Sequence, residues 1–187
     1  MTKKEINVVI NRGSSHIEPI LLGLTVPIGI TKFQAFLALK PILKGKLYWH
    51  TLRRAYELSD NLFQYRFDVL NAFQSDEPYR EYLMDKEERK FLKGLPERVT
   101  IYRGMTSKEK KSGYFGSSWT LGKEKAGFFA HIYGRNMATR DLKKTIHKLE
   151  VNKSEILAYM NSRGEEEVIY IHNKSTSVQK PGSNSKR

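Results

Sequence analysis

The sequence predicts an α+β fold, in which a helical first part precedes a strand-rich second part. Between residues 32 and 92, apolar residues recur at spacings of three, four or seven, which is typical of helices that bury one face. After residue 96, short runs alternate between apolar and polar residues, which is typical of strands. Helices followed by strands, rather than helices alternating with strands, favour α+β over a doubly wound parallel sheet.

The composition is that of a globular protein without cysteine chemistry. The chain has 187 residues, 39% of them hydrophobic, and no cysteine. It can therefore bury a core, but it cannot form disulfides, zinc–cysteine or iron–sulfur sites, or use a cysteine nucleophile. No two of the five histidines lie four residues apart, and no phosphate-binding glycine loop or nucleophile elbow is present. We expect no metal and no serine–histidine machinery.

The chain is strongly basic, with 33 Lys and Arg against 20 Asp and Glu, a formal net charge of +13. This charge favours an acidic partner, either nucleic acid or an acidic protein such as an antitoxin, but it is equally compatible with solubility alone. The longest uncharged run, residues 19–31, is too short to cross a membrane, and no apolar signal segment follows the basic N-terminus. We expect a cytoplasmic protein with no membrane partner.

Residues 1–95 are expected to form a mainly helical part of a single domain. Residues 6–10 alternate weakly, as a strand would, and residues 17–30 predict strand or irregular structure. In the helical region we expect breaks at Pro41 and Pro78, an end at Gly45, a cap at residues 59–61 and a stop at Gly94. The side chains expected in the helical core are Phe33, Phe36, Leu37, Leu43, Trp49, Leu52, Tyr56, Phe63, Phe67 and Leu70.

Residues 96–172 are expected to form a strand-rich core. The predicted strands are residues 99–102, a strand entered through residues 113–119, residues 145–151 and residues 167–171. A helix over residues 123–133 is expected to begin at a Thr120 cap, with Ala126, Phe129, Ala130 and Tyr133 buried. Trp119, Phe128 and Phe129 are expected in the core. Residues 173–187 carry no acidic residue, are rich in Ser and Lys, and predict a disordered basic tail.

Three short motifs in the second part carry candidate chemistry. They are Tyr102-Arg103-Gly104, then Ser118-Trp119-Thr120, and then Arg163-Gly164-Glu165-Glu166-Glu167 leading into a strand. Each has an ordinary explanation when taken alone. Arg103 suits the surface at a strand end, Ser118 suits the approach to a helix, and a run of glutamates suits a solvated turn.

In this order the motifs resemble the arginine–serine–glutamate class of ADP-ribosyltransferases, and most closely its small phage and prophage members. The resemblance covers residues 99–171 and includes Ala126 to Ala130 and the Glu-x-Glu-Val-Ile pattern that ends at Ile169. Residues 156–159, with Asn161 and Arg163, are similar to the loop that precedes the catalytic glutamate in that family. The resemblance implies a split β-sandwich core, NAD as substrate, and a place among toxins or phage host-takeover enzymes acting in the host cytoplasm.

The resemblance assigns roles that the chemistry of NAD cleavage makes reasonable. Breaking the nicotinamide–ribose bond develops positive charge on the ribose, which a fixed carboxylate stabilises. Glu167 is the candidate, contacting the ribose 2′-OH, with Ser118 holding it in place. Arg103 would grip the pyrophosphate, because its guanidinium offers a fork where lysine offers a point charge.

Further residues have roles through the same resemblance. Glu165 would face the acceptor and help to deprotonate an arginine guanidinium, while Glu166 would point to the other face of the strand as a solvated bystander. The remaining candidates for contact with NAD or substrate are Tyr102, Gly104, Thr120, Tyr159 and Asn161.

The sequence does not decide the acceptor. Glu165 favours arginine on a host protein, whereas the net charge of +13 favours a nucleic-acid base, or a protein within a nucleic-acid-bound machine. The motifs and the charge are also compatible with NAD hydrolysis without transfer, with a non-catalytic basic nucleic-acid-binding protein, and with an inhibitor that only binds a host factor. The enzyme hypothesis requires Arg103, Ser118 and Glu167 to lie close together in space.

Overall fold

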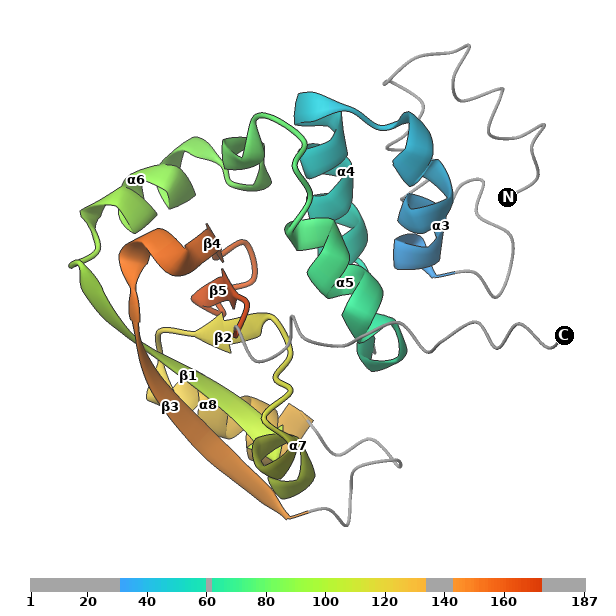
Figure 1. The fold of residues 1–187 in the computed structure, drawn as a ribbon. Helices are drawn as coiled ribbons and strands as arrows, with labels where there is room; N and C mark the ends of the chain where they lie inside the picture. The colour runs from blue at the N-terminus through green and yellow to red at the C-terminus, as the bar shows by residue number, and fades with distance from the viewer. Residues whose placement is uncertain (1–30, 60–61, 134–142, 173–187) are drawn as a thin grey trace, which may run out of the picture. The chain divides into compact units, whose positions relative to one another are not determined.

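The computed structural model describes residues 31–59, 62–133 and 143–172, and the chain divides into two compact units at Arg89/Lys90 (Figure 1). The expected strand at residues 6–10, the segment 17–30, Asp60 and Asn61, and the tail 173–187 lie outside the described residues. The expectation that the helical part and the strand-rich part belong to one domain stays a prediction.

The first unit is helical, as predicted. Its elements are α3 (Lys32–Leu39), the 3₁₀ turn η2 (Lys40–Ile42), α4 (Gly45–Glu57), η3 (Leu62–Tyr65), α5 (Arg66–Phe73), η4 (Arg80–Leu83) and α6 (Lys86–Gly94), which runs across the boundary. Thr31 and Gln34 form a capping box at the start of α3. The breaks at Pro41 and Pro78 and the stop at Gly94 are confirmed. Gly45 was wrongly expected to end a helix, because it begins α4 with a left-handed φ of 52°.

Aromatic side chains fill the core of the first unit. Phe36 meets Tyr48 with ring centroids 5.5 Å apart, and Tyr56 meets Phe73 at 5.1 Å, both edge to face. Burial is confirmed for Phe33, Phe36, Leu43, Trp49, Leu52, Tyr56 and Leu70. Two expectations were wrong, since Leu37 is only half-buried and Phe67 is 44% exposed. The Phe67 side chain lies beside Arg66, whose guanidinium sits 4.4 Å from the ring centroid.

A buried ion pair ties α4 to the start of α6. Both Nη atoms of Arg53 donate to the two carboxylate oxygens of Glu88, at 2.5 and 2.9 Å, and Arg53 Nε donates to Glu57. The side chains of Arg53 and Glu88 are only 12% and 6% exposed. Glu88 also accepts from the backbone of Asp85, whose own carboxylate accepts from the Glu88 N–H. The Glu88 carboxylate is therefore both a helix cap and the partner of a buried cation.

The second unit is an antiparallel sheet with short helices, so the α+β prediction is confirmed. Its elements are β1 (Arg98–Thr106), α7 (Ser107–Ser112), β2 (Ser118–Thr120), α8 (Lys123–Phe128), the π-helical turn η5 (Phe129–Tyr133), β3 (Lys144–Asn152), η6 (Lys153–Glu155), β4 (Ile156–Met160) and β5 (Glu167–Tyr170). The strand order is β3-β1-β2-β5-β4. Residues 156–159, which the resemblance placed in a loop, instead belong to β4, and α7 was not predicted.

The sheet is joined unevenly along its width. β1 and β3 pair over nine residues, from Arg98–Asn152 to Thr106–Lys144, and β2 pairs with β5 over three. β1 and β2, by contrast, share only the pair Tyr102–Thr120. The ribbon β3-β1 and the three strands β2-β5-β4 are therefore two pieces of sheet that meet at one point.

The segment after β2 packs closely on β1. Ala126 and Ala130 are buried as expected, and a methyl group added at Gly104 would lie 2.2 Å from the Ala126 carbonyl oxygen. Gly104 therefore lets the backbone of α8 and η5 approach the strand. The N-cap of α8 is Gly122 rather than Thr120, and Thr120 accepts a hydrogen bond from the Gly122 N–H.

Aromatic side chains in the second unit partly follow the prediction. Trp119 lies in the core as expected, 2% exposed, with edge contacts to the rings of Phe115 and Tyr170. Phe128 was expected in the core but is 43% exposed, and Phe129 is half-buried. None of the helices within the described ranges has the length and apolar character needed to cross a membrane.

Replacing Glu88 by alanine should destabilise the first unit by about 3 kcal/mol, the low end for breaking a buried ion pair, because the buried Arg53 cation loses the carboxylate partner of both Nη atoms and keeps only the carboxylate of Glu57. Urea unfolding of the full chain measures this change, with Glu87→Ala as the control, since Glu87 is an exposed neighbour in the same helix turn. Equal losses of stability in the two variants would contradict the role given to the ion pair.

Candidate functional site

A hydroxyl–carboxylate hydrogen bond joins β2 to β5. Ser118 Oγ donates to Glu167 Oε1 at 2.5 Å, and Glu167 is 5% exposed. The register pairs Thr120 with Glu167. Because side chains two residues apart on a strand, and those of paired residues, lie on the same face, Ser118, Thr120 and Glu167 share one face of the sheet. The strand pairing thus fixes the carboxylate of Glu167 in a mostly buried position.

Arg103 reaches this pair from the neighbouring strand. Its Nη1 atom donates to the Ser118 carbonyl oxygen at 2.5 Å. The register Tyr102–Thr120 would continue to the pair Gly104–Ser118, but the ladder stops before it. Arg103 starts from the opposite face of β1 to Tyr102, and its guanidinium occupies the place where the strands separate. The Arg103 side chain thus makes the hydrogen bond to the Ser118 carbonyl that the backbone of Gly104 would otherwise make.

A second carboxylate orients the guanidinium of Arg103. Glu109 Oε1 accepts from Arg103 Nε at 2.9 Å and from the Gly116 N–H at 3.1 Å. A methyl group at Gly116 would lie 2.5 Å from Arg103 Nη2, so glycine leaves the room that the guanidinium fills. Neither Glu109 nor Gly116 was predicted as a site residue.

The sequence does contain a signal for the position of Glu109. Thr106 and Glu109 have the spacing of a capping box, and Thr106 Oγ1 accepts from the Glu109 N–H at the start of α7. That spacing predicts the helix start. The pattern does not predict that the carboxylate pairs with Arg103, because this contact depends on the course of the chain after α7.

The Nη2 atom of Arg103 lies against Gly116. No hydrogen bond within the described ranges occupies it, and the side chain is 21% exposed. His147 pairs with Arg103 in the register of β1 and β3. Burial, followed by the charges of Lys110 and His172, lowers the pKa of His147, so its imidazole is neutral at pH 7. Arg103 is therefore the cationic member of this residue pair.

The loop before β5 places a guanidinium against two carboxylates. Arg163 Nη2 donates to Glu165 Oε2 at 2.7 Å and lies 3.7 Å from Glu167 Oε2. Left-handed backbone at Gly164 (φ 67°) and Glu166 (φ 49°) produces the turn that brings these groups together. Glu165 and Glu167 therefore lie near enough to share one guanidinium nitrogen.

Glu166 is not the strand residue that was expected. It precedes β5, and its backbone makes two hydrogen bonds. The Glu166 N–H donates to Asn161 Oδ1, and the Glu166 carbonyl accepts from the Leu121 N–H. Asn161 also accepts from the Gly164 N–H through its carbonyl. Asn161 and Glu166 thus shape the loop that carries Glu165.

The other predicted ligand-contacting residues have different surroundings. Thr120 is buried and donates to the Glu165 carbonyl oxygen at 2.9 Å, and Tyr102 is half-buried on the same face. Tyr159 pairs with Val168 and therefore faces away from the Glu167 side. It is 4% exposed and stacks on Phe91 with ring centroids 4.3 Å apart, which does not support the predicted contact of Tyr159 with NAD.

No protein-family model, curated protein or solved structure matches this chain. In the part of the chain that the structure describes, no three His, Asp or Glu side chains gather in a way that could hold a metal ion. What the geometry offers is a fixed carboxylate, a hydroxyl and a guanidinium, groups that bind hydroxyls and phosphates and stabilise developing positive charge.

The two glycines of this region should respond differently to an added methyl group. Gly104→Ala meets backbone atoms of α8 and η5 and should cost at least about 1–3 kcal/mol of stability, as overpacking does. Gly116→Ala meets only the Arg103 guanidinium, which can shift by weakening its hydrogen bonds to Glu109 and Ser118, so the loss of stability should be smaller, about 0.5–1.5 kcal/mol for a hydrogen bond lost. Urea unfolding of both variants beside the wild type measures this. A Gly116→Ala variant less stable than Gly104→Ala would contradict the packing described here.

Proposed function

We propose that the chain is an NAD-dependent mono-ADP-ribosyltransferase that transfers ADP-ribose to an arginine of a host protein. The observation that carries the proposal is the chain of hydrogen bonds from Arg103 through Ser118 to Glu167. These residues lie in three separate motifs, and Ser118 and Glu167 are 49 positions apart in the sequence. Ser118 thus joins the other two residues, because its carbonyl contacts Arg103 and its hydroxyl contacts Glu167, and this link supports the enzyme class that the motifs resemble.

The shape of the sheet supports the same proposal at the level of the fold. A split β-sandwich holds its substrate where two pieces of sheet part, and here β1 and β2 separate after a single residue pair. Arg103 and Ser118 lie at that separation, and Glu167 lies one strand further on. We propose that the nicotinamide half of NAD binds beside this junction.

The carboxylate of Glu167 is suited to the cleavage step. When the bond from nicotinamide to the ribose breaks, its electron pair leaves with neutral nicotinamide, and the ribose develops positive charge. A mostly buried carboxylate stabilises that charge strongly, because little water screens it and it need not reorganise. Ser118 holds one oxygen of the carboxylate, which leaves Oε2 directed to the side where Glu165 and Arg163 lie.

Arg103 is suited to the pyrophosphate of NAD. Its Nε and Nη1 atoms are held by Glu109 and by the Ser118 carbonyl, so the plane of the guanidinium is fixed before substrate binds. Nη2 then presents its protons to a phosphate oxygen. The Glu109 carboxylate reduces the positive charge at this point, so the geometry of the donor contributes more than its charge.

The contact between Arg163 and the two glutamates supports arginine as the acceptor. It demonstrates that a guanidinium fits against Glu165 while one of its nitrogens lies within 4 Å of Glu167. In the transfer step a nitrogen of the acceptor guanidinium forms the new bond to the ribose carbon, and its proton passes to Glu165 and then to water. Transfer to a nucleic-acid base is the alternative, and the same assay separates the two.

Labelled NAD incubated with bacterial lysate tests the proposal, using the wild type and glutamine variants at three adjacent glutamates. Glu167→Gln should abolish both nicotinamide release and labelling of macromolecules, because it removes the charge that stabilises the ribose. Glu165→Gln should lose labelling by at least about 100-fold while keeping slow nicotinamide release, since general acid–base groups contribute about 10²–10⁴-fold.

Glu166→Gln is the matched control in this series and should behave as the wild type, because Glu166 contributes to the loop through its backbone. Loss of label after protease treatment identifies the acceptor as a protein, and loss of label after nuclease treatment identifies it as nucleic acid. Intact NAD with every variant and with the wild type would overturn the proposal. Full transfer by Glu165→Gln would overturn the assignment of the acceptor to Glu165.

A further inference from the structure

An exposed tyrosine in the first unit has a strained backbone. Tyr79 has a φ of 68°, in the left-handed region, and its side chain is 53% exposed. A bulky residue in this region costs about 1–3 kcal/mol and persists only where the surroundings hold it. About half of Tyr79 is exposed, so burial of the ring offsets only part of the cost of this backbone conformation.

The turn that carries Tyr79 is held from two sides. Trp49 Nε1 donates to the carbonyl oxygens of Glu77 and Pro78, and the Glu77 carboxylate accepts from the Gly45 N–H and from Lys44 Nζ. Gly45 also has a left-handed φ, and a methyl group there would lie 3.4 Å from the Tyr79 ring. Tyr79 thus rests on the first turn of α4, while about half of its surface faces solvent.

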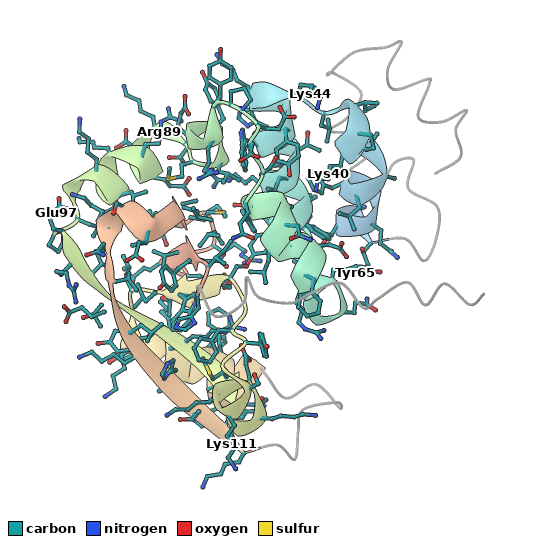
Figure 2. All side chains as sticks on the ribbon, viewed as in Figure 1. Lys40, Lys44, Tyr65, Arg89, Glu97 and Lys111 are labelled. Atoms are coloured by element: carbon teal, nitrogen blue, oxygen red, sulfur yellow. The ribbon has the colours of Figure 1, made fainter. Side chains whose placement is uncertain are left out.

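Nitrogen-bearing side chains surround this ring and its neighbour Tyr82. Lys46 Nζ lies 5.4 Å from the Tyr79 ring centroid and 4.6 Å from that of Tyr82, and the Arg89 guanidinium lies 5.8 Å from Tyr82. The His50 ring meets Tyr82 edge to face at 5.6 Å. We call the five residues Lys46, His50, Tyr79, Tyr82 and Arg89 the Tyr79 surface. In Figure 2 the labels of Arg89 and of Lys44, the residue before α4, help to locate it.

The charge of this surface is positive at neutral pH. A hydrogen bond to the Tyr82 hydroxyl is the main cause that raises the pKa of Lys46 above its usual value, and so the ammonium stays charged. Glu81 is an acidic neighbour that acts on Lys46, and Glu77 is engaged by Lys44 and Gly45. The basic residues of this region, Lys44, Lys46, Arg80 and Arg89, outnumber these two carboxylates, and the chain as a whole has a net charge of +13.

We propose that the Tyr79 surface binds single-stranded nucleic acid, with a base stacked on the Tyr79 ring and phosphates held by Lys46 and Arg89. Exposed aromatic rings beside cations are the means by which proteins bind single strands, since every base has a face to stack and every nucleotide a phosphate. An acidic protein would pair with the cations, but its carboxylates would make no favourable contact with the exposed face of the Tyr79 ring. Stacking does not read base identity, so binding should tolerate many sequences. This activity is separate from ADP-ribose transfer.

Fluorescence anisotropy with the full chain tests the proposal, using labelled single strands of about 15 nucleotides, in DNA and RNA forms, and a duplex of the same sequence. The wild type should bind the single strands more tightly than the duplex, because only unpaired bases can stack on Tyr79. Comparison of the DNA and RNA forms identifies the sugar that the surface prefers. Absence of binding to any single strand at low salt would overturn the proposal.

Tyr79→Gly separates binding from folding. Glycine relieves the left-handed backbone, so the variant should be at least as stable as the wild type, while affinity for single strands should fall about 5- to 150-fold through loss of one stacked base. Tyr79→Phe, which keeps the ring, should retain binding. Tyr114→Ala is the matched control, because Tyr114 is 49% exposed and lies in the second unit.

Lys46→Gln provides a second measurement that does not depend on the Tyr79 variant. Removing one phosphate contact should lower the slope of log affinity against log salt by about 1. Lys108→Gln, which removes an exposed lysine of the second unit, should leave that slope unchanged. Wild-type affinity in Tyr79→Gly, or equal effects of Tyr79→Gly and Tyr114→Ala, would overturn the proposal.

Discussion

The hydrogen bond between Ser118 and Glu167 is the interaction on which the proposed active site depends. A carboxylate that is only 5% exposed loses most of its hydration, and it needs hydrogen bonds to remain charged. Ser118 Oγ supplies one such bond from the adjacent strand. The pairing of β2 with β5 fixes this bond, so a shift of register by one residue would turn the two side chains to opposite faces.

Arg103 depends on the same short strand, but through its backbone. The carbonyl of Ser118 receives the guanidinium because β1 and β2 stop pairing after Tyr102 and Thr120. Continued pairing would use that carbonyl in the ladder and would leave Arg103 without its anchor. The interruption of the sheet therefore leaves the Ser118 carbonyl free for the contact that positions the cation. Glycine at 116 completes the arrangement, because any side chain there would meet the guanidinium.

Much of this architecture follows from local sequence signals. Helix breaks at Pro41, Pro78 and Gly94, and strands around residues 99–102, 145–151 and 167–170, agree with periodicity and turn residues. The order of motifs grouped Arg103, Ser118 and Glu167, which are linked through the carbonyl and the hydroxyl of Ser118, and their shared role in binding NAD stays a prediction. The helix α7 and the strand β4 were missed because each is short and lacks a clear apolar period. The pairing of Glu109 with Arg103 arises only from tertiary structure, since the two residues are six positions apart and lie in a strand and in the helix that follows it.

The errors also have physical causes. Phe67 and Phe128 fit an apolar helix pattern but are exposed, because short helices bury fewer residues than a periodic pattern implies. Gly45 was predicted to end a helix, as left-handed glycines commonly do, whereas here its left-handed φ lies at the first residue of α4. Tyr159 belongs to the motif region, yet strand alternation turns it away from Glu167. Tyr79 carries no sequence signal at all, because backbone strain is visible only in the folded chain.

A crystal structure of the Glu167→Gln variant with NAD tests the central claim most directly, since the substitution should slow cleavage and retain the substrate. The account predicts the nicotinamide ribose within hydrogen-bond distance of residue 167, and a pyrophosphate oxygen on Nη2 of Arg103, with Glu109 still on Nε. NAD bound away from these residues, or no NAD bound at millimolar concentration, would contradict it.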